Sequence, residues 1–254
     1  MAATTDTDHE EHTAAPGSPP PAGRRRGAGR FVALAVSFLG ELLITAGLVL
    51  GLFVVYSLWW TNVVADRAAD RQAERVRDTW ARDAGPSGPG ALDTKAGVGF
   101  LHVPAMGDGE VLVEKGTSSE ILNDGVAGYY TDPVEATLPS SGKEGNFSLA
   151  AHRDGHGAKF HDIHKIEKGD PIVFETKDTW YVYKVYSILP ETSKYNVDAI
   201  APVPEESGRT EAGHYITLTT CTPVYTSRYR YVVWGELVRT EKVDADRTPP
   251  KELG

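Results

Sequence analysis

Four segments with different hydrophobic patterns follow one another along the 254-residue chain. Residues 1–30 hold few large apolar side chains and are rich in Ala, Thr, Pro and Gly, which predicts a disordered segment. Residues 31–60 are almost wholly apolar, with Glu41 as the only charge. A helix needs about 20 apolar residues to cross a bilayer, whereas the apolar run of a signal peptide has about 7–15. We therefore expect residues 31–60 to be a transmembrane anchor.

Residues 61–96 are expected to form a stalk and a linker. Acidic and basic side chains are mixed with alanine up to Asp83, which is typical of a helix whose charges face solvent. The segment from Gly85 to Gly90 has the sequence GPSGPG, and its prolines and glycines end any helix.

From Gly97 onward, short runs alternate apolar and polar residues between breaks rich in Gly, Pro, Asn and Asp. This period of two predicts β-strands, and about seven short strands favour a mainly β fold, either a barrel or a sandwich. Short helices are expected at residues 118–123 and 158–166, and a flexible polar tail at 243–254. The candidate strands are residues 99–103, 111–114, 146–152, 171–176, 180–189, 215–221 and 229–238.

The charge distribution predicts the topology and excludes one class of partner. The formal net charge is −9, and the part after the apolar run has no dense Lys/Arg cluster, so we expect no nucleic-acid partner. Arg24, Arg25, Arg26 and Arg30 precede the apolar run, and such charges favour the cytoplasmic side. We expect a single-pass membrane protein with a cytoplasmic N-terminus and an extracellular C-terminal domain.

Cys221 is the only cysteine, which excludes an internal disulfide and any site with several cysteine ligands. It ends a strand-like run, next to polar residues and a turn. Outside the cytosol an unpaired thiol tends to oxidise, so a lone one there predicts a function. A buried cysteine that packs as a small hydrophobe is the alternative. A nucleophilic cysteine needs a base or a cation nearby, because a free thiol has a pKa of about 8.5.

Histidine and arginine supply the candidate partners of this thiol. His152 lies where an apolar strand-like run meets a polar turn, at the rim of the predicted fold. Arg228 and Arg230 are two positions apart at the start of the last predicted strand, so both side chains are expected to point to one face. A guanidinium beside the thiol stabilises an oxyanion by charge-assisted hydrogen bonds. The spacing alone favours neither arginine, and an exposed strand arginine is the alternative for each.

Three further histidines follow His152 and are candidate metal ligands. His156, His161 and His164 have a spacing that matches no metal-ligand motif, and no cysteine lies near them in the sequence. We therefore expect them to be polar surface residues.

Two segments resemble the sortases, which are membrane-anchored cysteine transpeptidases of Gram-positive bacteria. Residues 217–221, TLTTC, followed by Arg230, resemble the TLxTC…R motif of this family, and residues 150–157, AAHRDGHG, resemble the segment with its catalytic histidine. The resemblance covers about residues 97–242 and the anchor. The sequences GELLITAG at 40–47 and LWWTN at 58–62 are most similar to class E sortases of actinobacteria.

This resemblance implies a closed sortase-type β-barrel of about eight strands with short helices, after a single transmembrane helix. It implies Cys221 as nucleophile, His152 as general acid/base and Arg230 as oxyanion stabiliser, because the spacing of the motif selects Arg230 over Arg228. The implied domains are a disordered cytoplasmic segment (1–30), an anchor (31–60), a stalk and linker (61–96), a catalytic barrel (97–242) and a flexible tail (243–254).

The resemblance also implies substrate-binding residues. Tyr130, in the sequence Gly-Tyr-Tyr, and Thr220 are expected to contact the substrate, with Tyr129 as the alternative to Tyr130. Some sortases bind calcium through acidic loop residues. The sequence shows no equivalent set, so we expect no metal and no cofactor.

The implied activity is cleavage of a C-terminal LAxTG/LPxTG-type sorting signal between Thr and Gly. The reaction passes through a thioacyl intermediate and joins the surface protein to a cell-wall amine. The expected partners are surface proteins with such a signal, a cell-wall precursor with an amine, and the membrane. Two alternatives remain: an extracytoplasmic thiol hydrolase, in which water replaces the amine, and a non-catalytic membrane-anchored β-barrel binding module.

Overall fold

A computed structural model describes residues 27–82 and 99–254. The segment predicted to be disordered, up to residue 26, and the predicted linker at 83–98 lie outside the described residues. The chain forms two compact units, one that ends at Leu52 and one from Phe53 to Gly254.

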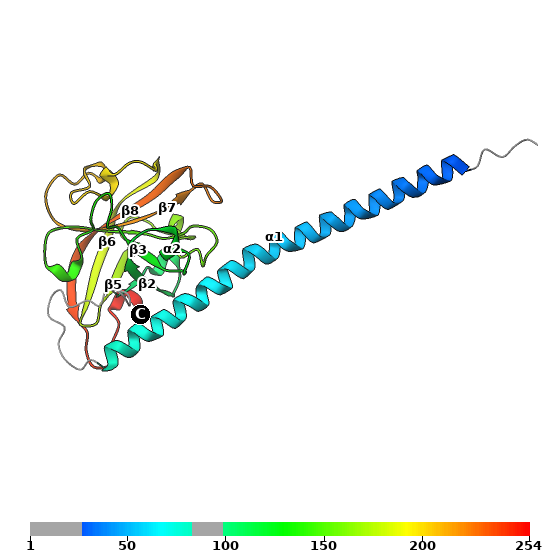
Figure 1. Ribbon diagram of the computed structural model, residues 1–254. Coiled ribbons are helices and arrows are strands. Elements are labelled where there is room, and N and C mark those ends of the chain that lie inside the picture. Colours follow the sequence, from blue (N-terminus) through cyan, green and yellow to red (C-terminus); the bar gives the residue numbers. More distant parts are fainter. Residues whose placement is uncertain (1–26, 83–98) are drawn as a thin grey trace, which may run out of the picture. The chain divides into compact units, whose positions relative to one another are not determined.

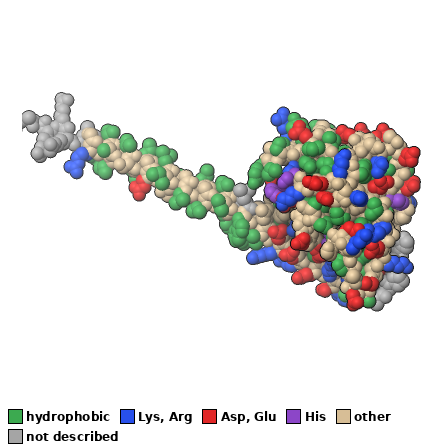
Figure 2. All heavy atoms as spheres, turned by 180° about the vertical axis from the view of Figure 1, so that it is seen from behind, with side chains coloured by type: hydrophobic (Ala, Val, Ile, Leu, Met, Phe, Trp, Pro, Cys, Tyr) green, Lys and Arg blue, Asp and Glu red, His purple; other side chains and the backbone are tan. Residues whose placement is uncertain are grey.

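Helix α1 (Gly27–Arg82) contains the predicted membrane span, residues 31–60. The N-terminal unit holds the first part of this helix, up to Leu52. Its apolar stretch is long enough to cross a bilayer, and its large side chains, from Phe31 onward, are exposed. Figure 2 shows that hydrophobic side chains dominate the surface of this helix, whereas acidic and basic side chains are mixed on the barrel. One helix therefore has the properties of a membrane anchor.

The second unit contains a closed barrel of eight strands, as the resemblance implied (Figure 1). The strands follow one another around the barrel in the order β1-β2-β3-β4-β7-β8-β6-β5. Two neighbouring pairs are parallel, β2–β3 and β4–β7, and the others are antiparallel. The strands are β1 (Gly99–His102), β2 (Glu110–Lys115), β3 (Ala127–Tyr129), β4 (Gly145–Ala150), β5 (Pro171–Glu175), β6 (Thr179–Ser193), β7 (His214–Thr222) and β8 (Tyr229–Lys242).

The helices of this unit are short. They comprise α2 (Ser119–Leu122) and the 3-10 turns η1 (Pro104–Met106), η2 (Pro139–Ser141), η3 (Ile163–Lys165), η4 (Asp198–Ile200), η5 (Glu205–Ser207) and η6 (Lys251–Leu253). Helix α2 confirms the helix expected at 118–123. The helix expected at 158–166 was wrong, because this segment forms turns and only η3. Its buried residues Phe160, Ile163 and Ile166 recur every three positions, which is the period of a 3-10 helix.

Strand β3 was missed in the sequence because it is only three residues long. It lies between β2 and β4, and its central Gly128 packs against Gly116, where an added Cβ atom would lie 1.9 Å from the carbonyl oxygen. The barrel interior is filled by aromatic and aliphatic side chains such as Phe147 and Phe174, whose ring centroids are 4.7 Å apart. Burial of each such side chain contributes roughly 2–3 kcal/mol.

The part of α1 after the apolar stretch packs against the barrel. The sequence indicated a solvated helix, but Ala69 and Val76 are buried with Phe100 of β1, and Trp80 meets the Phe100 ring edge-on. Positions 69, 73, 76 and 80 recur every three or four residues and therefore share one helix face. The mixed charges occupy the other faces, which is why their pattern alone concealed the apolar stripe.

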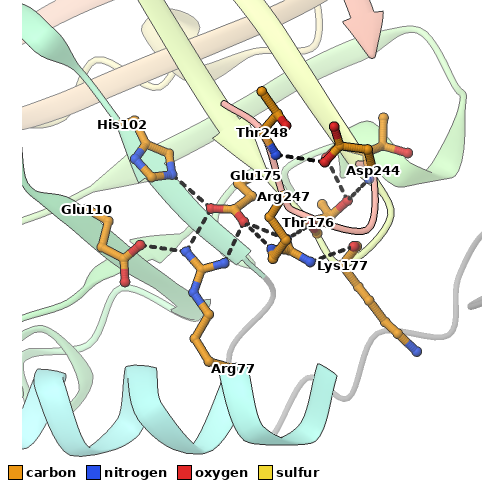
Figure 3. A network of polar contacts seen from close by, with 10 residues as sticks. Arg77, His102, Glu110, Glu175, Thr176, Lys177, Asp244, Arg247 and Thr248 are labelled. Atoms are coloured by element: carbon orange, nitrogen blue, oxygen red, sulfur yellow. Dashed lines mark hydrogen bonds and ion pairs between the residues drawn. The ribbon is translucent and has the colours of Figure 1, made fainter. Parts of the chain in front are cut away.

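A buried carboxylate joins α1, the barrel and the C-terminal tail (Figure 3). Glu175 of β5 is 1% exposed and bonds Arg77 of α1, His102 of β1 and Arg247 of the tail. Arg247 also donates to the carbonyl oxygens of Thr176 and Lys177. The composition of the tail predicted flexibility, whereas these contacts tie residue 247 to the barrel.

We predict that Glu175→Ala destabilises the second unit by about 3 kcal/mol, because it removes the buried carboxylate that binds two half-buried arginines and a histidine. Denaturant unfolding of the full chain in detergent, followed by tryptophan fluorescence, measures this change. The matched control is Lys165→Ala, which breaks an exposed ion pair with Asp162 and should change stability by less than about 0.5 kcal/mol. Equal effects of the two substitutions would contradict the role of Glu175.

The same carboxylate predicts a pH dependence. Burial alone would raise the pKa of Glu175, but hydrogen bonds from Arg77, His102 and Arg247 outweigh it and lower the pKa from 4.5 to about 2. The stabilisation is therefore present above pH 4.5 and is lost as the pH falls toward 2. The stability difference between the parent and Glu175→Gln should shrink over this interval, and a difference that grows would contradict the network.

Candidate active site

Cys221 and Arg230 lie directly opposite each other on neighbouring strands. The antiparallel register of β7 and β8 pairs them as Cα partners. Ile216 and Leu218 of β7 belong to the barrel core, so alternation turns Thr219 and Cys221 to the opposite, outer face. Cys221 is half-buried and is a free thiol. A nucleophile and a cation therefore share one face of the sheet.

Arg230 is held by the backbone, and Arg228 is not part of this pair. The guanidinium of Arg230 donates to the carbonyl oxygens of Tyr229, at 3.0 Å, and Ser227, at 3.3 Å. Arg228 precedes β8, is exposed, and lies 5.1 Å from the ring centroid of Tyr229. Of the two candidates, only Arg230 is paired with Cys221 in the ladder.

His152 lies at the same barrel rim as Cys221. Strand β4 runs parallel to β7 with Ala150 opposite Thr219, and the next N–H group, of Ala151, donates to the carbonyl oxygen of Thr219. The chain leaves the sheet immediately after these residues. His152 therefore begins a loop at the rim of the barrel, residues 152–160, which we call the His152 loop. Its ring is half-buried, and its Nε2 atom lies 2.9 Å from Oδ1 of Asn123. Because the amide oxygen only accepts, Nε2 is the donor in this contact.

The pKa of His152 is lowered from its ordinary value of 6.5. Burial of the ring is the main cause, and charge on His156 adds to it, while Asp154 opposes it. The rings of His152 and His156 lie 5.4 Å apart. The imidazole of His152 is therefore mostly neutral at pH 7, which leaves Nδ1 as a proton acceptor.

Two supporting residues were missed in the sequence. Asn123, at the end of α2, positions the His152 ring, and Arg153 joins the His152 loop to the cysteine strand. The buried guanidinium of Arg153 donates to Oγ1 of Thr222 at 3.1 Å and to the carbonyl oxygen of Cys221 at 3.4 Å. Arg153 is adjacent to a candidate residue in the sequence, but no local pattern marks a side chain whose partners lie 68 and 69 positions away.

The two tyrosines of the Gly-Tyr-Tyr stretch have different surroundings. Tyr129 is 4% exposed and packs in the barrel core, with its ring 6.4 Å from that of Phe147. The hydroxyl of Tyr130 lies 2.9 Å from Oγ1 of Thr219 on the outer face. Burial raises the pKa of Tyr130, so this group is a neutral hydrogen-bonding phenol. The geometry favours Tyr130 over Tyr129 as the residue available to a ligand.

Thr220 points away from this outer face. Its hydroxyl donates to the carbonyl oxygen of Ala151 at 2.7 Å and is buried. Thr219, its neighbour, lines the outer groove. Thr220 thus fixes the backbone immediately before His152, and the threonine that lines the groove is Thr219, which the sequence did not single out.

A groove of about 320 Å³ runs along the outer face beside Arg230. Its walls combine Tyr130 and Thr219 with apolar side chains of β8 and of the segment around η4. Polar residues come from the end of β6, from the loop after β6 and from the loop after β3. The apolar contributors are Val197, Ala199, Ile200 and Val232, and the polar ones are Asp132, Thr192, Lys194, Tyr195 and Asn196. Such a lining offers both apolar contacts and hydrogen-bonding groups to a ligand.

A second hollow, of about 590 Å³, lies around Glu175, Arg77 and Arg247. It lies far from Cys221, because Glu175 pairs near the far end of β8 through Trp180 and Glu241. Neither hollow is lined by Cys221 or His152, but the smaller groove is lined by Arg230, the ladder partner of Cys221, and is therefore the candidate substrate groove.

One cluster in the described part of the chain brings three metal-type ligand atoms together. These atoms, from His102, Glu110 and Glu175, lie within 4.8 Å of one another. Two arginines already neutralise Glu175, so the cluster fits an ion-pair network better than a cation site. His161 and His164 instead lie with Nδ1 within hydrogen-bonding distance of backbone carbonyl oxygens.

Comparison with known proteins gives consistent results. Residues 101–238 match the model of the sortase domain. The chain is 77% identical to Sortase SrtE2 of Streptomyces coelicolor over the full length of both proteins. It is 47% identical to Sortase SrtE1 of the same organism, over 79% of this chain and 56% of that protein.

The solved structures that resemble this chain show the same barrel. The crystal structure of Sortase E1 from Streptomyces coelicolor with a tripeptide in the active site is 46% identical, with a TM-score of 0.58, over 62% of this chain and 96% of that one. Sortase E from Streptomyces avermitilis is 34% identical, with a TM-score of 0.54, over 62% of this chain and 97% of that one.

The effect of His156 on the pKa of His152 is testable. His156→Ala removes a charge that lowers the pKa of His152, so that pKa should rise toward 6.5. NMR titration of the full chain with labelled histidine measures it directly. His164→Ala, at an exposed position after the same loop, is the control and should leave the His152 pKa unchanged. A pKa of His152 that falls or stays constant in His156→Ala would contradict the proposed coupling.

Proposed function

The chain belongs to the sortase family, as a class E cysteine transpeptidase, and we propose that Cys221, His152 and Arg230 perform its reaction. The observation that carries this proposal is the pairing of Cys221 with Arg230 across β7 and β8, beside a peptide-sized groove. The proposed substrate is a surface protein whose C-terminal sorting signal is of the LAxTG/LPxTG type.

In the first step, Nδ1 of His152 takes the thiol proton and the sulfur of Cys221 attacks the Thr carbonyl carbon of the signal. The lowered pKa of His152 supports this step, since a neutral imidazole is the form that accepts a proton. The C=O electron pair moves to oxygen and forms a tetrahedral oxyanion. Arg230 stabilises this charge by charge-assisted hydrogen bonds.

In the second step, the oxyanion collapses and the Thr–Gly amide bond breaks. His152 gives its proton to the departing Gly nitrogen, so protons balance, and the Thr acyl group stays on Cys221 as a thioester. An amine of a cell-wall precursor then attacks this thioester and releases the thiol. The new amide joins the surface protein to the wall.

The groove supports the choice of an aliphatic signal. Val197, Ile200 and Val232 offer apolar contacts of the kind that Leu and Ala side chains require. Tyr130 projects its hydroxyl toward Thr219 in the same groove, so we propose that it contacts the backbone of the signal. Thr220 is kept as a positioning residue through its bond to Ala151.

The N-terminal part of the chain supports a location for this reaction at the outer side of the membrane. We propose that α1 anchors the enzyme, with residues 1–30 in the cytoplasm, residues 61–96 as the stalk and linker, and residues 97–242 as the extracellular catalytic domain. The arginines before the apolar run support this orientation. Secreted proteins with a sorting signal and wall precursors with a free amine meet at that side of the membrane.

The proposal predicts the products from an LAxTG peptide. With excess amine, the full chain in detergent should give mainly the peptide–amine conjugate, which mass spectrometry identifies. Cys221→Ala should give no conjugate. Arg230→Ala should lower kcat at least about 100-fold, which is the cost of losing an oxyanion donor, whereas Arg228→Ala should stay within about twofold.

Two outcomes would count against the proposal. Hydrolysed peptide as the sole product in excess amine would favour the thiol hydrolase. Conjugate formation by Cys221→Ala would remove the cysteine mechanism altogether.

A further inference from the structure

The first turns of α1 after the apolar stretch contact the loop that begins at His152. Oδ1 of Asn62 accepts a hydrogen bond from the N–H group of Gly157 at 3.0 Å. One turn later, Oδ1 of Asp66 binds the ammonium group of Lys159 at 2.9 Å. An added Cβ atom at Gly157 would lie 2.9 Å from Asp66, so the two segments touch closely. The membrane helix and the His152 loop therefore share a specific polar contact.

The same turn of α1 also contacts the segment that holds Asn123. Ala65 is 2% exposed, and an added Cβ atom at Gly125 would lie 2.9 Å from its carbonyl oxygen. Gly125 has a φ of +75° and follows Asn123 by two residues. Since Asn123 bonds the ring of His152, α1 packs against the segments on both sides of that hydrogen bond.

The His152 loop needs support from outside. It contains His156 and Ala158, with φ values of +48° and +40°, a conformation that residues other than glycine adopt only under strain. Internal bonds, such as the one from the N–H group of Phe160 to the carbonyl oxygen of His152, define only part of it. A strained loop persists when its surroundings fix it, and α1 contributes two of the fixing contacts.

We propose that Asn62, Ala65 and Asp66 of α1 position His152 for proton transfer. The helix then supports the geometry of the active site in addition to anchoring the chain. Asn62 acts through the loop and not on the substrate. This inference rests on the acid/base role proposed for His152. It implies that detaching this turn of α1 lowers turnover while the groove keeps its affinity for the peptide.

The test uses the full chain in detergent with an LAxTG peptide and an amine. Asn62→Ala removes the acceptor for Gly157 and should lower kcat about tenfold, the low end of what a misplaced catalytic group costs, with KM within about twofold. Asn62→Asp keeps an acceptor oxygen and should restore kcat to within about threefold of the parent. Asp66→Asn weakens the ion pair with Lys159 and should also lower kcat. Its matched control is Asp70→Asn, at an exposed position one turn further along α1, which should keep the kcat of the parent.

A second measurement does not depend on turnover. NMR titration should show the pKa of His152 rising in Asn62→Ala, because a loosened loop exposes the ring and burial is the main cause of its lowered pKa. In Asp70→Asn it should not change.

The inference is overturned if Asn62→Ala keeps both kcat and the His152 pKa of the parent, or if it raises KM without lowering kcat. His152→Ala in the same assay separates this inference from the proposed mechanism. If His152→Ala is inactive and Asn62→Ala is normal, the mechanism stands and the inference fails. If His152→Ala turns over normally, the acid/base role fails, and the inference fails with it.

Discussion

The antiparallel register of β7 and β8 is the constraint on which the active site depends. It sets Cys221 opposite Arg230 and Thr219 opposite Val232. Because side chains alternate across a strand, a slip of one residue would turn Arg230 to the other face and leave the thiol without a cation. The register is itself fixed by the core, since the inward residues Leu218 and Val233 are fully buried partners in the same ladder.

Closure of the barrel adds the third group. The parallel pairing of β4 with β7 brings Ala150 beside Thr219, so the chain that leaves the sheet at His152 does so next to the cysteine strand. Parallel neighbours require a long connection, and here β5 and β6 lie between them in the sequence. Arg153 then ties the His152 loop to the carbonyl oxygen of Cys221, and Asn123 fixes the ring from the other side. Three segments far apart in sequence thus converge on one rim.

Much of the fold was accessible from the sequence, because strands of four or more residues show their alternation and the long apolar helix shows its length. Cys221, His152 and Arg230 were identified through a family motif. Physical reasoning alone did not decide whether Arg228 or Arg230 lies beside the thiol, and the register of β7 and β8 shows that Arg230 is the partner of Cys221. Asn123, Arg153 and Thr219 were not predicted, since their roles come from partners 29 to 89 positions away. The contact between α1 and the rim was concealed for a similar reason: the charges of residues 61–82 dominate the pattern, and the small Ala65 and Ala69 carry the packing.

The central claim is that Cys221 carries the acyl group of the cleaved signal. Its most direct test is the intact mass of the full chain quenched during turnover of an LAxTG peptide without added amine, with the modified residue located by peptide mapping. The account predicts an added mass equal to the peptide acyl group ending at Thr, attached to Cys221 and removed when an amine is supplied. Cleavage of the peptide with no adduct, or an adduct on another residue, would contradict it.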